Sequence, residues 1–171
     1  MKRLILSTMG LLWAGLAFAQ ETKQQQIANW ERAKTYTMEY LEAMPEAAYA
    51  MKPTPDIRSF AQQMGHIADA NYAFASAASG IESPMKGSIE KGDDLSKATI
   101  TEAVMNSYDF VISAIEGMAD SDFDESIKFF GMDVKSGLAL EKGFEHQTHH
   151  RGQCTIYLRL NGVTPPEEKL F

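Results

Sequence analysis

The 171-residue sequence has a single cysteine, Cys154, and few basic residues. One cysteine can form no intramolecular disulfide, and it cannot supply the cysteine pairs of a structural zinc site. The chain has 16 lysines and arginines against 23 aspartates and glutamates, which gives a formal net charge of −7. This balance argues against nucleic acid or an anionic membrane surface as a partner, because both bind clustered basic side chains. Stability is therefore expected from core packing or a metal ion, with Cys154 a small buried residue in a helix.

Long hydrophobic runs are also scarce, and the one that occurs lies at the N-terminus. Lys2 and Arg3 precede an apolar stretch over residues 4–18, which ends in an A-x-A tripeptide at residues 17–19. A charged start, an apolar middle and a small-residue end are typical of a secretory signal peptide. A membrane anchor is the alternative, but the stretch is short for a span of about 20 apolar residues, and no stop-transfer pattern follows it. The sequence thus predicts a signal peptide at residues 1–19.

Cleavage near Ala19 leaves residues 20–171, a length that suits a single domain with one buried core. Loss of Lys2 and Arg3 reduces the basic residues from 16 to 14 against 23 acidic ones, so the formal charge becomes −9. No cysteine lies at the cleavage point to support a lipoprotein anchor. We expect the mature chain to be exported, to the periplasm or the cell exterior, without a stable membrane anchor.

Hydrophobic periodicity predicts four helices and no sheet. The expected helices cover residues 23–43, residues from a cap at Thr54-Pro55-Asp56 to about Gly80, residues from a cap at Thr99 to Gly117, and residues 136–161. Residues 126–135 are expected to form at most a short extended piece. The polar linker at residues 80–97 can extend about 59 Å at ~3.3 Å per residue, while a twenty-residue helix is about 30 Å long. Such a linker lets the second and third helices lie parallel, so we expect an all-α four-helix bundle with at least one long crossover.

The last predicted helix carries the candidate functional residues. At about 100° per residue, its central stripe comprises Ala139, Gly143, His146, His150, Cys154 and Tyr157. His146 and His150 are one turn apart, about 6 Å in rise, so both rings can reach one ion. The alternative is a pair of core histidines whose nitrogens are hydrogen-bonded within the protein. Two neutral imidazoles buried together would each need such a partner, which favours metal binding. His149 points about 100° away from His150 and is interpreted as a boundary residue.

The fourth histidine, His66, cannot be placed by periodicity alone. It lies roughly 120° around its helix from Phe60, on a flank of small residues that is either a close helix contact or a half-exposed edge. Two other metal motifs are excluded. Gln147 stands where an H-E-x-x-H metalloprotease has its glutamate, and no Glu-x-x-His pair of a di-iron bundle occurs. A mononuclear three-histidine site remains, with its third ligand open.

Two segments of the sequence resemble the signatures of the DinB-like family of bacterial metal-dependent proteins. FEHQTHHRGQCTIYLRLNGVTPP is similar to the C-terminal signature, and MPEAAYAMKPTPDIRSFAQQMGHIADAN is similar to the N-terminal one. The resemblance covers nearly all of residues 20–171. It implies an up-down-down-up four-helix bundle that binds a divalent ion, nickel or zinc in relatives, through three histidines. Matched by motif, these histidines are His66, His146 and His150.

Three imidazoles with an open coordination position are more typical of a catalytic than of a structural site. Imidazole suits zinc, nickel, iron or copper. Among these, the resemblance implies zinc or nickel. Candidates to hold the ligand rings by hydrogen bonds are Gln153, Tyr157 and Asp69. Arg151 and Arg159 are either contacts for an anionic substrate or solvated helix charges, and the second role is the commoner one.

Two hypotheses of different class follow. The first is an exported metal-dependent enzyme of hydrolase or thiol-transferase type, because some DinB-like relatives are thiol transferases or thiol-dependent isomerases. Export argues against thiol transfer, because low-molecular-weight thiols are mainly cytosolic. The second is a non-catalytic, stress-associated protein whose metal ion stabilises a bundle without disulfides. The small-molecule substrate is not identified, a homodimer is left open, and nucleic acid is not expected as a partner.

Overall fold

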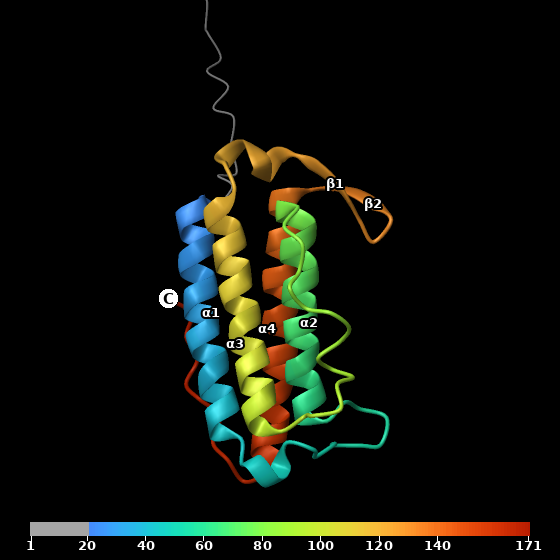
Figure 1. Ribbon diagram of the computed structural model, residues 1–171. Coiled ribbons are helices and arrows are strands. Elements are labelled where there is room, and N and C mark those ends of the chain that lie inside the picture. The colour runs from blue at the N-terminus through green and yellow to red at the C-terminus, as the bar shows by residue number, and fades with distance from the viewer. Residues whose placement is uncertain (1–20) are drawn as a thin grey trace, which may run out of the picture.

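The computed structural model describes residues 21–171, and the predicted signal peptide at residues 1–19 lies outside the described residues. Four long helices run alongside one another (Figure 1): α1 (Lys23–Ala43), α2 (Phe60–Ser79), α3 (Lys97–Gly117) and α4 (Ser136–Leu160). The connections contain two short 3-10 helices, η1 (Glu46–Ala48) and η2 (Asp120–Asp124), and two strands, β1 (Ser126–Phe129) and β2 (Met132–Lys135). The prediction of an all-α four-helix bundle is confirmed. Among residues 21–171, no helix is both long and apolar enough to cross a membrane.

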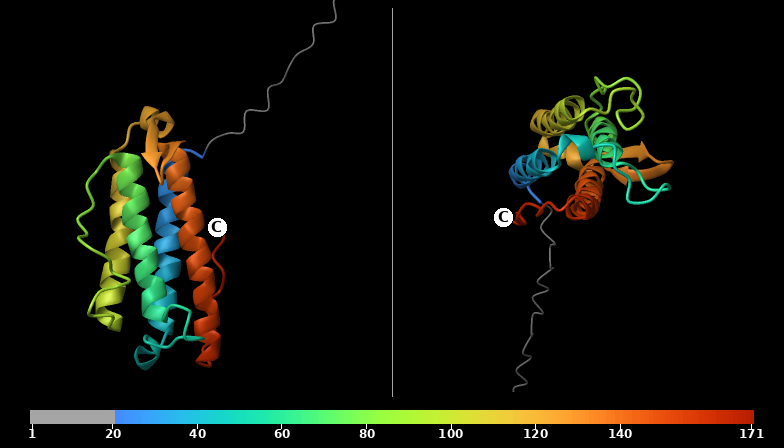
Figure 2. Two further views of the ribbon diagram at one scale, coloured as in Figure 1. Left: turned by 90° about the vertical axis from the view of Figure 1, so that its right-hand side faces the viewer. Right: turned by 90° about the horizontal axis from the view of Figure 1, so that it is seen from below.

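The chain directions give the bundle an up-down-down-up topology. Helices α1 and α4 run one way along the bundle, and α2 and α3 run the other way (Figure 1). Consecutive helices α2 and α3 are parallel because the crossover between them returns along the outside of the bundle (Figure 2). Helix α2 packs against both α3 and α4, and α1 packs against α3 and α4. The two helices that carry the candidate ligands, α2 and α4, are therefore direct neighbours.

Each helix buries one side in a shared core. The largest buried apolar side chains are Trp30, Leu41, Met44, Phe60, Met64, Ile67, Ile100, Tyr108, Ile115, Leu140 and Leu158. Trp30 of α1 packs edge-on against Tyr108 of α3 and Phe144 of α4, with ring centroids 5.7 and 5.4 Å apart. Cys154 is fully buried, as expected, and burial raises the pKa of its thiol. Apolar packing thus joins the helices where no disulfide can.

The start of α2 differs from the prediction. The helix begins at Phe60, several residues after the expected cap at residues 54–56. The Ser59 hydroxyl accepts a hydrogen bond from the backbone N–H of Gln62, and the Gln62 side chain accepts one from the backbone N–H of Ser59. This reciprocal capping box satisfies two N–H groups that have no partner within the helix, and it fixes the helix start at this point.

The start of α3 also differs, because the cap is Ser96 and the helix begins at Lys97 rather than after Thr99. The Ser96 hydroxyl accepts a hydrogen bond from the backbone N–H of Thr99. The Thr99 hydroxyl donates to the carboxylate of Asp94 at 2.6 Å, so it is occupied in the turn before the helix. The end of α3 at Gly117 agrees with the prediction.

Residues 126–135 form a two-stranded antiparallel sheet, so the prediction of no sheet was wrong. Phe129 pairs with Met132, which leaves Phe130 and Gly131 as a two-residue loop. Both loop residues have positive φ, 49° and 78°, as in a type I′ turn. Asparagine, aspartate or glycine usually occupies the position of Phe130, so the sequence lacks the usual hairpin signal.

The crossover between α2 and α3 touches α2 at Gly65. A Cβ atom at this position would lie 2.9 Å from the backbone N and Cα of Glu90, so the crossover can pass this closely only over glycine. One turn further along α2, Asp69 accepts hydrogen bonds from the Ser88 hydroxyl at 2.6 Å and from the N–H groups of Ile89 and Glu90 at 2.7 and 3.2 Å. This segment of the crossover is therefore fixed to α2.

We expect the substitution Gly65→Ala to destabilise the fold by about 1–3 kcal/mol, because the new methyl group collides with crossover backbone. Urea denaturation monitored by circular dichroism measures the change. Gly152→Ala is the matched control, because a Cβ there meets nothing within 4 Å, and better helix propensity should stabilise the protein by about 0.5–1 kcal/mol. An equal gain in stability for both variants would show that the crossover does not require a glycine at position 65.

Candidate metal centre

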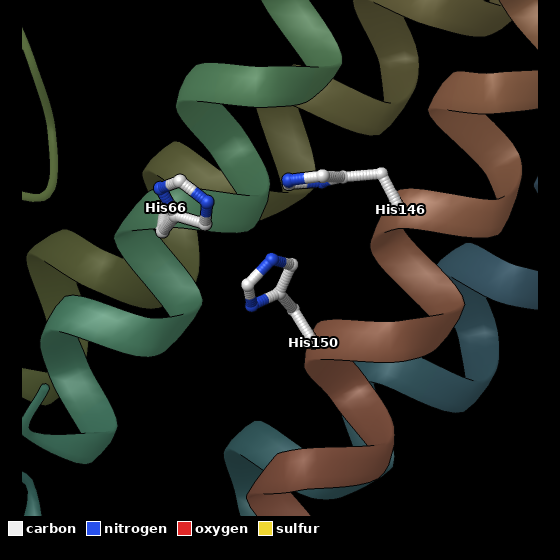
Figure 3. A group of neighbouring side chains, drawn as sticks. All are labelled: His66, His146 and His150. Atoms are coloured by element: carbon white, nitrogen blue, oxygen red, sulfur yellow. The ribbon is translucent and has the colours of Figure 1, made fainter. Parts of the chain in front are cut away.

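Three of the four histidines meet between α2 and α4. His66 of α2 faces His146 and His150 of α4, and the rings point toward one another (Figure 3). The ring centroids of His146 and His150 lie 4.3 Å apart, and those of His66 lie 5.0 and 4.5 Å from them. One ligand nitrogen from each ring can be chosen so that all three lie within 4.8 Å of one another. The helix contact thus brings His66 beside the pair whose spacing was evident from the sequence.

Burial keeps the two histidines of α4 neutral. Burial, together with the charges of the neighbouring histidines and Arg58, lowers the pKa of His146 to about 4 and that of His150 to about 3. Both rings are therefore unprotonated at neutral pH, which is the form that binds metal ions. His150 is 9% exposed, while the side chain of His66 is 25% exposed, so the cluster extends from the interior to the surface.

The ring of His66 is held by the crossover. Its Nδ1 lies 2.8 Å from a carboxylate oxygen of Glu90, and Nε of Arg58 donates to the other oxygen at 2.7 Å. Burial alone would raise the pKa of Glu90, but hydrogen bonds and charges from Arg58 and His66 hold it below its usual range. A charged Glu90 accepts a hydrogen bond from Nδ1–H and leaves Nε2 of His66 free for an ion, a common arrangement of histidine ligands.

The ring of His150 is held by an amide of α2. Nε2 of Gln63 lies 2.7 Å from Nδ1 of His150, and the same amide contacts the side chain of Gln153. Nε2 of Gln153 in turn lies 2.7 Å from Nε2 of His149. Rotating both side-chain amides by 180° exchanges the donors and acceptors along this series of hydrogen bonds. Gln63 then accepts a hydrogen bond from Nδ1–H of His150, and Nε2 of His150 is free for an ion. With its amide turned in this way, Gln63 would hold the ring of His150, the role in which Gln153 was expected, and Gln153 contacts Gln63.

Sequence reasoning missed both Gln63 and Glu90, although the sequence held a signal for Gln63. Gln63 is buried and lies one turn before Ile67, within the apolar stripe of α2. A polar residue in such a stripe indicates a specific hydrogen bond. Glu90 gave no such signal, because it lies in a polar linker rich in charges, and only the close passage at Gly65 places it beside His66.

The other residues singled out from the sequence lie further from the three rings. The Tyr157 hydroxyl donates to the backbone carbonyl of Arg58 at 2.7 Å, and Asp69 binds the backbone of the crossover. Each thus positions a residue that contacts His66 or its partner. His149 is exposed and lies outside the three-histidine cluster, as expected of a boundary residue.

Arg151 is not a solvated helix charge, which was the commoner of its two expected roles. Its side chain is buried and donates to Gln147 at 2.7 Å and to Thr37 of α1 at 3.3 Å. The guanidinium lies 4.5 Å from the ring centroid of Tyr36. Arg151 therefore joins α4 to α1. Arg159 is exposed, in agreement with the solvated role.

Phe74 of α2 closes the cluster beside His146, with ring centroids 5.8 Å apart. Gly143 of α4 makes room for this ring, because a Cβ there would lie 3.0 Å from Cβ of Phe74. Nδ1 of His146 is buried and has no hydrogen-bond partner among the described residues. A bound ion or an ordered water would supply the partner that this buried nitrogen lacks.

Comparison with known proteins identifies a family and a relative that this chain resembles. The model of the DinB family matches residues 19–170 of the chain. The uncharacterised protein YrdA of Bacillus subtilis is 32% identical over 79 residues, which are 43% of this chain and about half, 47%, of that protein.

Two solved structures share the fold. A DinB-like protein from Bacillus cereus superposes with a TM-score of 0.76 at 20% identity, covering 88% of this chain and 100% of that one. A DinB-like protein from Bacillus subtilis superposes with a TM-score of 0.70 at 21% identity, covering 84% and 96%. At such identities the likeness concerns the fold alone.

We expect Glu90→Gln to weaken zinc binding by about tenfold to a hundredfold, because an amide accepts the Nδ1 proton of His66 without the charge that strengthens the imidazole as a ligand. Competition with a chromophoric chelator measures the affinity. Glu82→Gln is the matched control in the same crossover, since the Glu82 side chain is 86% exposed and, within residues 21–171, forms an ion pair only with Lys86. Equal affinities for the two variants would contradict the role of Glu90.

We expect the metal-free protein to lose stability as the pH falls from 7.5 to 5. In the folded state the pKa of His150 is about 3, below the ordinary 6.5. Below pH 6.5 the unfolded chain therefore binds a proton at this residue that the folded chain does not bind. For this one buried group the loss is about 1–2 kcal/mol by pH 5. Urea denaturation at several pH values, with chelator present, measures it. A pH dependence unchanged in His150→Gln would contradict the assignment.

Proposed function

The chain belongs to the DinB family, and from this we propose that His66, His146 and His150 bind one divalent metal ion and that the protein is a metal-dependent enzyme of hydrolase or transferase type. One observation carries the proposal. Three imidazoles from two helices converge, and two of them are held at Nδ1 by Glu90 and Gln63, which directs their other nitrogens to a common point.

The residues present fit such an ion. Neutral imidazole nitrogens are suitable ligands for zinc, nickel, copper or iron, and zinc and nickel are the ions we propose. The ligand nitrogens lie within 4.8 Å of one another, so small ring rotations bring them to the ~2.0–2.1 Å that a zinc–nitrogen bond requires. The unpartnered Nδ1 of His146 adds to this fit.

The composition of the cluster favours a reactive site. Within the described residues it comprises three histidines, with no carboxylate or cysteine as a fourth ligand. Three protein ligands leave a coordination position for water or substrate, as in catalytic zinc sites. When bound, the ion would act as a Lewis acid that polarises a substrate or lowers the pKa of a bound water or thiol. Glu90 and Gln63 would orient the imidazoles, and Phe74 would exclude water from one side of the cluster.

We also propose that the chain acts outside the cytoplasm, on the strength of the leader-like sequence at residues 1–19. Hydrolysis suits this location better than transfer of a low-molecular-weight thiol. A second candidate function is structural. The cluster joins α2, α4 and, through Glu90, the crossover, so an ion there would stabilise the bundle even without catalysis.

We expect purified protein to contain one zinc or nickel ion per chain and each of His66→Ala, His146→Ala and His150→Ala to lose it, because two imidazoles hold the ion far more weakly than three. Elemental analysis of the purified variants measures the content. His149→Ala is the matched control and should keep its metal, since this side chain lies outside the cluster.

Undiminished metal in the three cluster variants would overturn the proposed site. A structure of the metal-loaded protein then separates the two functions. Water or an exogenous ligand on the ion supports an enzyme, and a closed four-ligand shell supports a structural role.

A further inference from the structure

The tip of the hairpin carries an aromatic residue that the fold does not require. Phe130 is 76% exposed, and its φ of 49° lies in the left-handed region, which costs a bulky residue about 1–2 kcal/mol. Asparagine, aspartate or glycine would form the same type I′ turn without this cost. Neither burial nor turn geometry therefore explains a phenylalanine here, and strained residues of this kind concentrate at functional sites.

Phe130 begins a continuous surface of aromatic rings that ends at the histidine cluster. Its ring centroid lies 4.2 Å from that of Phe129 and 6.0 Å from that of Phe74. Phe74 and Phe129 are 4.9 Å apart, and Phe74 lies 5.8 Å from His146. We call Phe74, Phe129 and Phe130 the aromatic shelf. Phe74 and Phe129 are half-buried, so the shelf leads from solvent at Phe130 directly to a candidate ligand.

Arg58 lies at another side of the cluster. Its Nη2 is 3.4 Å from Nδ1 of His66, but a nitrogen that donates its proton to Glu90 has no lone pair in the ring plane to accept a second bond. The N–H groups at Nη2 of Arg58 are therefore available to a further hydrogen-bond acceptor, and the side chain is 38% exposed. An imidazole that binds a metal ion is the neutral form, so three such ligands do not compensate the charge of the ion. The charge of Glu90 is matched by that of Arg58.

We propose that the ligand of this site is a small organic anion with an aromatic body. Its anionic head meets the ion and Arg58, and its ring lies on the aromatic shelf. This inference rests on the proposed metal site and names the class of molecule that the site accepts. A ring packed on the shelf gains apolar burial and edge or offset-stacked contacts, which favour it over a small anion with the same head.

The test compares acetate with phenylacetate, two carboxylates that differ by one phenyl group. Each is titrated into cobalt-loaded protein, and visible absorption of the cobalt reports binding without any assay of activity. We expect wild-type protein to prefer phenylacetate about fivefold or more. In Phe130→Asn the preference should fall below about twofold, while the thermal midpoint stays equal or rises, because asparagine suits the turn.

Ile156→Gln is the matched control, because Ile156 is an exposed apolar residue of α4, 54% exposed, outside the aromatic shelf. It should keep the wild-type preference. Equal binding of the two probes by wild-type protein, or a preference that survives in Phe130→Asn, would overturn the inference while the metal site stands. Failure of the protein to take up cobalt overturns the proposed site and this inference together, and it is observed before any probe is added.

Discussion

The contact between α2 and α4 is the interaction on which the candidate site depends. At Gly143 the absence of a side chain lets Phe74 press against the backbone of α4, since a Cβ there would lie 3.0 Å from that residue. The same close approach brings His66 within reach of both histidines of α4. A helix pair separated by larger side chains would leave His66 at an exposed edge, where an imidazole is an ordinary surface residue. The spacing of two backbones therefore decides whether three histidines form one site.

The bundle topology and the support of the site are two results of one constraint. Parallel α2 and α3 require a crossover that returns along the bundle, and this crossover passes over α2 at Gly65. Because Asp69 binds its backbone there, Glu90 is held beside His66. A short turn between α2 and α3 would make them antiparallel and would remove the carboxylate. Any ion held by His66 is thus linked to the folding of the crossover, since Glu90, which holds the His66 ring, belongs to the crossover.

The parts of the structure that depend on local periodicity could be predicted from the sequence. The four helices, the parallel pair and the meeting of His146 with His150 follow from spacing within one element or from the length of one linker. Spacing did not decide the position of His66, because its neighbours on α2 are small residues compatible with either packing or exposure, and only resemblance to known proteins suggested it. Glu90 and the hairpin could not be foreseen, since each depends on a contact between residues distant in sequence or on an atypical turn.

The electrostatics of the molecule set limits on how an anionic ligand could bind. The sequence carries a formal net charge of −7, so the long-range field repels an anion rather than steering it toward the site. Close to the cluster the charges balance, because His146 and His150 are neutral and Arg58 pairs with Glu90. Attraction would then come only from a bound ion and from contacts within a few ångströms. A molecule that reaches the site against this field gains most from burying apolar surface, which depends little on charge. The phenylalanines beside His146 offer such a surface, and for this reason a strained and exposed Phe130 is consistent with selection for binding rather than for stability.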